Sequence, residues 1–306
     1  MANPLCPVTG EPAVRLVQWI DPHLLSELWR IVFKVDVKSS FGETTRFGLW
    51  QSPTGLYFFD PGLEGDHDFY MQFYRFLIER KVWAGEAIRN EFQRAATRIK
   101  PGDRVLDVGC GAATFQRAIP QARYVGLDPT LAGSIPGVRG ETLAEHLREH
   151  AGGYDAVCAF QVLEHLSAPV AMFADMVRAV KPGGLLIVGV PHVPSALTRI
   201  PNFLINAPPH HVTWWTKDAL AALAARGGVT VETIEKVDWN EYDSLIYWTA
   251  MCSPVRCRDI HYRHAWSWHA SALFGFYLGR VMHALIPRPK TRDEGAGLLL
   301  VARRTD

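Results

Sequence analysis

The stretch RVLDVGCGAATF, residues 104–115, decides the fold. It opens with a short apolar run typical of a buried strand, and the small residues that follow predict a tight turn leading into a helix. Glycines in such a turn let a ligand approach the backbone, and the free N–H groups of the next helix can bind an anion. The stretch therefore predicts a nucleotide-binding strand–turn–helix unit.

Similar apolar runs recur along the chain and alternate with helical patterns. They are RVLDVG (104–109), RYVGLD (123–128), YDAVCAF (154–160) and GGLLIVGV (183–190). Strands that alternate with helices predict a parallel sheet with crossover helices on its faces. A helical pattern also precedes the first run, from about Asp66 to Arg98, whereas residues 1–64 show strand and turn patterns only.

Composition narrows the class of protein. The chain has 306 residues, 48% apolar and 21% charged, with a net charge of +1. A general nucleic-acid binder needs a basic face, so the charge argues against a nucleic-acid partner. The five scattered cysteines do not indicate a disulfide framework, and the first residues, MANPLCPVTGEP, lack the pattern of a signal peptide. We therefore expect a cytoplasmic protein.

The glycine turn alone does not identify its ligand. A dinucleotide fingerprint would have glycine at position 114, where this chain has Thr114. Asp128 follows Gly109 by 19 residues, at the end of the next predicted strand. A carboxylate at that place can accept both hydroxyls of a ribose. A nicotinamide oxidoreductase remains a rival interpretation, against which Thr114 speaks.

Four motifs in order resemble those of class I S-adenosylmethionine-dependent methyltransferases. They are VLDVGCG, VGLDP, YDAVCAFQVLEHLSAP and KPGGLLIVGVP, and the resemblance covers roughly residues 66–238 and the final strand. It implies a Rossmann-like α/β sheet, mostly parallel with the last strand antiparallel, and helices on both faces. It also implies S-adenosylmethionine as the cofactor and methyl transfer as the reaction.

The resemblance also assigns the cofactor site. It implies that Asp107 lies near the methionine part, that the backbone of Gly109 and Gly111 faces the cofactor, and that Asp128 holds the ribose. The remaining positions that it implies are Pro129, beside Asp128, Phe160 and Gln161, near the adenine, and more weakly Glu141 or Thr142. Ala113 stands where the family usually has a third glycine.

The N-terminal region carries a second resemblance, to a zinc ribbon. CPVTG (6–10) and QSPTG (51–55) are similar to its two knuckles, but only Cys6 remains of the four ligand positions. Because a tetrahedral zinc site needs four ligands, we expect a degenerate ribbon without metal. The predicted domains are therefore residues 1–64 and a methyltransferase domain, 65–306.

Two adjacent histidines lie in APPHHVTWW, residues 207–215, after the predicted strand GGLLIVGV (183–190). The resemblance places His210 and His211 near the mouth of the cofactor site, where one could take a proton from a hydroxyl acceptor. The alternative is that both only fix the loop. Glu164 and His165 leave a similar choice between acid–base catalysis and support of the cofactor loop. Tyr70 and Tyr74 lie in the helical pattern that precedes the glycine turn. Their aromatic faces could contact the sulfonium of the cofactor, or the two rings could belong to the core.

Residues 239–294 form an aromatic-rich insertion before the last strand. A connection of this length should carry its own helices, and we expect them to cap the acceptor pocket. Two alternatives stay open: a metal site at Cys252, Cys257, His261 and His264, with unfamiliar spacing, and membrane contact through residues 265–287. We predict no bound metal.

The predicted function is methyl transfer from S-adenosylmethionine, most simply to an oxygen of a small metabolite, a glycan unit or a lipid-like acceptor. The alternative is a non-catalytic module that binds the cofactor or a partner on the same fold. Retention of Asp128 and of the glycine turn favours the enzyme.

Overall fold

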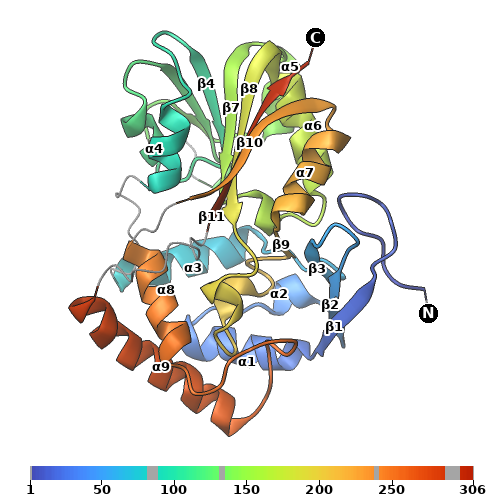
Figure 1. Ribbon diagram of the computed structural model, residues 1–306, viewed down its shortest axis with the longest axis vertical. Helices are drawn as coiled ribbons and strands as arrows, with labels where there is room; N and C mark the ends of the chain where they lie inside the picture. Colours follow the sequence, from blue (N-terminus) through green and yellow to red (C-terminus); the bar gives the residue numbers. More distant parts are fainter. Residues whose placement is uncertain (1, 81–88, 131–134, 238–240, 287–296, 306) are drawn as a thin grey trace.

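The computed structural model describes residues 2–80, 89–130, 135–237, 241–286 and 297–305 (Figure 1). Its large sheet has seven strands in the order β10-β11-β8-β7-β4-β5-β6. Their bounds are β4 Arg104–Val108, β5 Arg123–Leu127, β6 Val138–Arg139, β7 Tyr154–Phe160, β8 Val180–Pro191, β10 Val229–Val237 and β11 Gly297–Arg304. Strands β4 to β8 pair in parallel, and β11 runs antiparallel between β8 and β10. This is the predicted Rossmann-like sheet, and the prediction is confirmed.

Helices cover both faces of this sheet (Figure 1). On one face, α4 (Asn90–Ala96) packs Phe92 and Ala95 against the strands. The other face is covered by α5 (Leu143–His150), α6 (Pro169–Ala179) and α7 (Lys217–Arg226). Thr216 caps α7 by accepting a hydrogen bond from the N–H of Ala219. The sequence therefore predicted the layers correctly because each helix has one apolar face.

The helix expected after the glycine turn is a short 3-10 helix, η1 (Thr114–Ala118). Pro120 explains its length, because the residue before a proline disfavours helical backbone and Ile119 accordingly has φ −128° and ψ 51°. Three further 3-10 helices lie in the loops that follow β7 and β8: η2 (Leu163–His165), η3 (Ala196–Thr198) and η4 (Leu204–Asn206). They set the course of the loops at the end of the sheet.

A second, antiparallel sheet has the strand order β1-β2-β3-β9. Its strands are β1 (Arg15–Ile20), β2 (Phe47–Gln51), β3 (Tyr57–Asp60) and β9 (Thr213–Trp214). The first three come from the N-terminal region, but β9 comes from the loop between β8 and α7. Backbone hydrogen bonds therefore tie residues 1–64 to the methyltransferase-like domain.

The expectation that residues 1–64 contain only strands and turns is wrong. They also form α1 (Pro22–Val32) and the short α2 (Lys38–Phe41). A signal for α1 is present in the sequence: Asp21 caps the helix by accepting from the N–H of His23, and Pro22 occupies the first turn. The numerous prolines and glycines of residues 1–64 indicate turns, and this pattern obscures the helix signal.

The second core is built from aromatic residues. Trp29 of α1 contacts Phe69 and Phe73 of α3 (His67–Glu79), with ring centroids 5.1 and 5.5 Å apart. Tyr262 of the insertion is buried in the same cluster. The predicted helical pattern from Asp66 to Arg98 contains α3 and α4, while residues 81–88 lie outside the described residues.

The insertion forms helices α8 (Glu241–Cys252) and α9 (Trp266–Leu285), which pack against each other. Its ends, residues 239–240 and 287–294, lie outside the described residues. Between the helices, the chain returns to β1, where the Gln18 side chain accepts from the N–H of His261 at 2.8 Å. The insertion is thus packed onto the N-terminal region as well as onto the sheet domain (Figure 1).

Candidate functional site

The glycine turn follows β4 at the carboxyl edge of the parallel strands. Gly109 and Gly111 have φ of 67° and 52°, and Ala113 shares this left-handed conformation with φ 53°. A Cβ on Gly109 would lie 2.6 Å from Cγ2 of Val162, whereas one on Gly111 would meet nothing within 4 Å. Gly109 is therefore required by a close contact, and the open surface at Gly111 can receive a ligand.

Asp107 ends β4 beneath this turn and is 2% exposed. Its Oδ2 accepts a hydrogen bond from the hydroxyl of Tyr124, 2.8 Å away. Burial raises the pKa of the Asp107 carboxyl to about 7, although the bond from Tyr124 acts in the opposite direction. A buried carboxyl with this pKa is suited to bind a cationic group, which would favour its ionised form.

Asp128 lies at the end of β5, beside the turn. Its Oδ2 accepts from the N–H of Gly111 at 3.0 Å, and its Oδ1 accepts from the N–H and hydroxyl of Thr130 at 2.9 and 2.6 Å. Each carboxylate oxygen can still accept another bond. Pro129, predicted beside it, is exposed. Two carboxylates around an open glycine turn fit the ammonium and ribose hydroxyls of S-adenosylmethionine.

Phe160 is the last residue of β7, and Gln161 follows it. The Phe160 side chain lies in the core, with ring centroids 5.0 Å from Phe92 and 4.8 Å from Phe115. Gln161 has φ 57° and donates through Nε2 to the Glu91 carboxylate at 3.0 Å. Their predicted role beside the adenine remains a prediction, and the buried Phe160 ring leaves only its backbone for such a contact.

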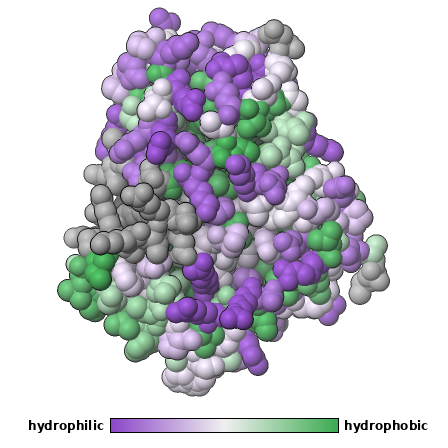
Figure 2. All heavy atoms as spheres, viewed as in Figure 1, coloured by the Kyte–Doolittle hydropathy of each residue, from purple (hydrophilic) through white to green (hydrophobic). Residues whose placement is uncertain are grey.

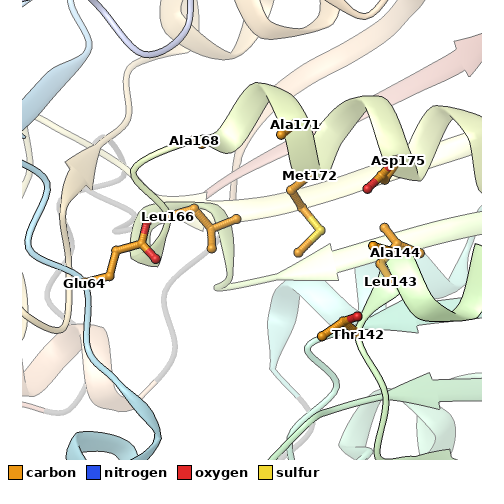
Figure 3. Close-up of a pocket in the computed structure, with 9 residues that line it drawn as sticks. All are labelled: Glu64, Thr142, Leu143, Ala144, Leu166, Ala168, Ala171, Met172 and Asp175. Carbon is orange, nitrogen blue, oxygen red and sulfur yellow. The ribbon is translucent and has the colours of Figure 1, made fainter.

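Thr142, the weaker candidate for the adenine side, lines a groove of about 280 Å³ between the start of α5 and α6 (Figure 3). Met172 and Leu166 form much of its apolar wall, and Glu64 lies at one end. The groove contains none of the residues of the glycine turn. It is therefore a feature of the outer surface beside the site.

Three histidines gather in the loops that follow β7 and β8. His165, His210 and His211 each offer a ring nitrogen within 4.8 Å of the others. The Nδ1 of His165 bonds with the carbonyl oxygen of His210, and that of His211 with Oδ1 of Asn206 at 3.1 Å. Burial lowers the pKa of His165 to about 4 and the pKa values of the other two well below the usual range. All three are therefore neutral near pH 7.

Three polar groups in and beside this cluster have no hydrogen-bond partner in the described part of the chain. They are the carboxyl of Glu164, Nδ1 of His210 and Nδ2 of Asn206. Burial raises the pKa of Glu164 to about 8, so it is protonated near pH 7. Because an unpaired buried polar group costs about 1–3 kcal/mol, these groups are candidates for binding a ligand or a water molecule.

Helix α3 covers the cluster with two tyrosines. The Tyr70 ring centroid lies 5.9 Å from His165 and 6.2 Å from His210. Burial and the nearby charge of Asp128 raise the pKa of Tyr74 to about 12, although Arg89 acts in the opposite direction. Both rings pack against the second core, and Tyr70 also contacts the histidine cluster.

The three histidines are the only group of three or more potential metal ligands within the described ranges. Cys252, Cys257, His261 and His264 do not converge there: His264 instead faces Glu27 at 3.9 Å. Neutral imidazoles can bind a transition metal, so the predicted absence of metal stays a prediction. Sequence reasoning missed the convergence of His165 with residues 45 positions away, because no local pattern reports it.

Comparison with protein families finds that residues 79–234 match the family described as "Methyltransferase domain". Among curated proteins, ubiquinone biosynthesis O-methyltransferases of Cronobacter sakazakii and Escherichia coli K12 are 32% and 33% identical over 97 residues. Each match covers 27% of this chain and 40% of the relative. The chain thus matches about two fifths of the length of these relatives.

Solved structures of similar shape include an Archaeoglobus fulgidus SAM-dependent methyltransferase, at 16% identity and a TM-score of 0.49, covering 76% of this chain and 100% of that one. Another is the 1,6-didemethyltoxoflavin-N1-methyltransferase of Burkholderia thailandensis, also at 16% identity and a TM-score of 0.49. This match covers 86% of this chain and 97% of that one.

The family match spans more than half of the chain, including the glycine turn, Asp128 and the histidine cluster. It confirms the predicted kind of protein, a methyltransferase of the class that uses S-adenosylmethionine. The part of the resemblance that concerns a zinc ribbon lies outside the matched residues. With the matched sequence and the seven-stranded fold in agreement, this chain belongs to the methyltransferase domain family.

Proposed function

We propose that this protein transfers a methyl group from S-adenosylmethionine to a hydroxyl oxygen of a small metabolite, glycan unit or lipid-like acceptor. The observation that carries the proposal is the pair of buried, unpartnered groups, the Glu164 carboxyl and Nδ1 of His210, in the loops that follow β7 and β8. One can donate and the other can accept a hydrogen bond, which is what a hydroxyl acceptor requires.

When bound, the cofactor supplies an electrophilic methyl group on a sulfonium. On the protein side, the Asp107 carboxylate would bind the ammonium of the methionine part, and Asp128 would bind the ribose hydroxyls. Gly111 lets the backbone come close. Alignment of the two reactants and exclusion of water by the buried site would provide most of the rate acceleration.

The acceptor hydroxyl would bind between Glu164 and His210. The neutral imidazole of His210 would accept the hydroxyl proton through Nδ1 as the oxygen becomes methylated. Protonated Glu164 would donate a hydrogen bond that orients the acceptor, and Tyr70 would form an apolar wall. His211 is held by Asn206 and would position the cluster.

The names of the ubiquinone biosynthesis relatives also specify methyl transfer to oxygen. The match to them is partial, so it supports the class of atom and not the acceptor molecule. The aromatic surroundings of the cluster, which include Phe73 at 5.0 Å from His210, favour an apolar acceptor body. The net charge of +1 over the whole chain argues against a general nucleic-acid binder.

The insertion would complete the acceptor pocket. The Tyr262 hydroxyl donates to the carbonyl oxygen of Asn206 at 2.7 Å, and Asn206 in turn binds His211. This contact supports a role for residues 239–294 in shaping the site. It also makes the insertion part of the second core, so we treat it as a structural element of the domain 65–306.

Residues 1–64 would be a degenerate zinc ribbon without metal. Support comes from the first knuckle, where the N–H groups of Val8 and Thr9 point to Sγ of Cys6 at 3.4 and 3.5 Å. In the second, Ser52 and Thr54 bond to each other through their hydroxyls at 3.0 Å. The two ligand positions of this knuckle are occupied by Gln51 and Thr54, and the Thr54 hydroxyl is engaged by Ser52.

The proposal is tested by incubating the protein with methyl-labelled S-adenosylmethionine and panels of phenols, sugars and hydroxylated lipids, followed by mass spectrometry of the products. We expect an O-methylated product whose formation is lost in His210→Gln and retained in the matched surface variant His23→Gln. Cofactor binding without transfer to any oxygen, nitrogen or carbon acceptor would favour the non-catalytic module.

A further inference from the structure

Helix α9 lies at the outer edge of the molecule, against α8 (Figure 1). It contacts α8 through small residues spaced four apart, Ser271, Gly275 and Gly279, all of them buried. A Cβ on Gly279 would lie 2.7 Å from the backbone nitrogen of Thr249, and one on Gly275 would lie 2.7 Å from the Thr249 carbonyl oxygen. These glycines permit close helix contact and fix which side of α9 faces outward.

The outward side of α9 is apolar. Its exposed large side chains are Trp266, Leu273, Phe274, Phe276, Tyr277, Leu278, Val281 and Leu285. Trp266 is 84% and Leu285 72% exposed. Figure 2 shows hydrophobic residues gathered at the lower left, where α9 lies in Figure 1. An exposed apolar surface of this extent marks an interaction site.

The chain around this surface is basic. From Cys252 to Ile286, the part of this region that the structure describes, the sequence contains four Arg residues, no Lys and one Asp, a net charge of +3 in a chain whose total is +1. The four cations, Arg256, Arg258, Arg263 and Arg280, are all exposed. The rest of the sequence therefore has a net charge of −2, and the stretch that contains the apolar face of α9 carries an excess of positive charge.

We propose that α9 and its basic neighbours form a docking surface for an anionic lipid bilayer. Apolar side chains flanked by cations are what a helix lying in the membrane interface presents. Trp266 and Tyr277 would lie at headgroup depth, where such rings concentrate. No helix in the described part of the chain is long and apolar enough to cross a bilayer, so α9 would lie along the surface.

A second copy of this chain is the other candidate occupant, and charge speaks against it. Pairing two α9 faces would bring together two described stretches that each carry a net charge of +3, whereas anionic lipids would neutralise each one. The proposal does not depend on methyl transfer, because it rests on exposure and charge alone. Its failure and the failure of the proposed function can therefore be told apart.

The test is co-sedimentation of the full chain with vesicles of phosphatidylglycerol and phosphatidylcholine, compared with phosphatidylcholine alone. We expect binding only to the anionic vesicles and its loss at high salt, since screening removes the electrostatic part. The variant Phe274→Glu/Tyr277→Glu should bind at least about tenfold more weakly, because it replaces two apolar contacts by like-charged ones. The matched control Leu5→Glu/Val14→Glu changes two side chains that are 63% and 61% exposed elsewhere and should bind as the wild type.

A second readout locates the contact. Brominated lipids should quench the tryptophan fluorescence of the wild type, and the quenching should fall in Trp266→Phe. Calorimetric titration with S-adenosylmethionine verifies that each variant is folded. Wild-type protein that stays in the supernatant with every vesicle overturns the proposal. So does a stable dimer in analytical ultracentrifugation that the Phe274→Glu/Tyr277→Glu variant dissolves, since α9 would then be a protein interface.

Discussion

The hydroxyl of Tyr124 donates a hydrogen bond to Oδ2 of Asp107, 2.8 Å away, and so holds in place the buried carboxyl beneath the glycine turn. Burial raises the pKa of this carboxyl to about 7, and the bond from Tyr124 opposes that rise. The ionisation of Asp107 therefore falls within the range of ordinary buffers, where cofactor binding can report it.

We expect the affinity for S-adenosylmethionine to fall as the pH drops below about 7, by up to about tenfold per pH unit, because the ammonium of the cofactor needs the Asp107 carboxylate. Removing the opposing bond in Tyr124→Phe should move the midpoint upward by about one pH unit. Calorimetric titration between pH 5.5 and 8.5 measures both curves. If the affinity curves of the wild type and Tyr124→Phe coincide over this pH range, Asp107 does not bind the cofactor.

Asp128 should carry the ribose. We expect Asp128→Ala to weaken cofactor binding at least about tenfold, because charge-assisted hydrogen bonds contribute about 1.5–3 kcal/mol. Asp128→Asn keeps one acceptor oxygen for Gly111 or Thr130 and should have a smaller effect. Asp259→Ala, at an exposed ion pair with Arg15, is the control. Equal affinity of Asp128→Ala and wild type would contradict the assigned site.

Glu164 should destabilise the fold at high pH. Its pKa is raised from 4.5 to about 8 by burial, so the folded state binds a proton that the unfolded state releases between these values. Stability should therefore decline as the pH rises from about 4.5 to about 8. Glu164→Gln lacks this decline and should be more stable at pH 8 by roughly 3–5 kcal/mol, at 1.36 kcal/mol per unit of pKa. Urea unfolding of both proteins at pH 4.5 and pH 8 measures it; a pH-independent difference would argue against a protonated Glu164.

His210 should act as the base. Loss of its Nδ1 acceptor in His210→Gln should lower kcat by about 100-fold or more, with little change in cofactor affinity. His211→Asn, which disturbs the hydrogen bond to Asn206, should cost less. Steady-state kinetics with any acceptor found in the panel separates the two, and similar losses in both variants would indicate a loop-fixing role.

The same cluster allows a check for metal. We expect dialysis against EDTA to leave the methyl transfer rate unchanged, and metal analysis of protein purified without chelator to find well under one zinc per chain. A rate that falls with EDTA and returns with a divalent cation would assign His165, His210 and His211 as metal ligands instead.

The sheet could be predicted because its information is local. Strands β4, β5, β7 and β8 were predicted from apolar runs, as is typical of parallel strands buried on both faces, whereas the two-residue strand β6 (Val138–Arg139) has no such run. Asp107, Gly109 and Asp128 were found because they stand at fixed places beside those strand ends. Helix α1 was not predicted, although Asp21 and Pro22 form a helix start signal. The prolines and glycines elsewhere in residues 1–64 indicate turns and obscure this signal.

The histidine cluster could be predicted only in part. His210 and His211 stand in a motif, but their approach to His165 depends on how the loops after β7 and β8 fold over each other. The unpartnered state of Glu164 depends on burial, which no spacing encodes. The same holds for α9: the sequence predicted a helix, whereas the seam at Gly275 and Gly279 decides which side stays exposed.

Strand β9 has a consequence for how this chain acquires its structure. Tyr57 pairs with Trp214 and Phe58 with Thr213, partners more than 150 residues apart in sequence. During synthesis, the amino-terminal strands emerge from the ribosome long before the strand that completes their edge. Pairings this distant fold slowly because a long loop must close first. Until residues 213–214 have been synthesised, the edge of β3 is unpaired and can pair with other chains. A chain truncated shortly before residue 213 should therefore aggregate and should not fold as a free amino-terminal domain.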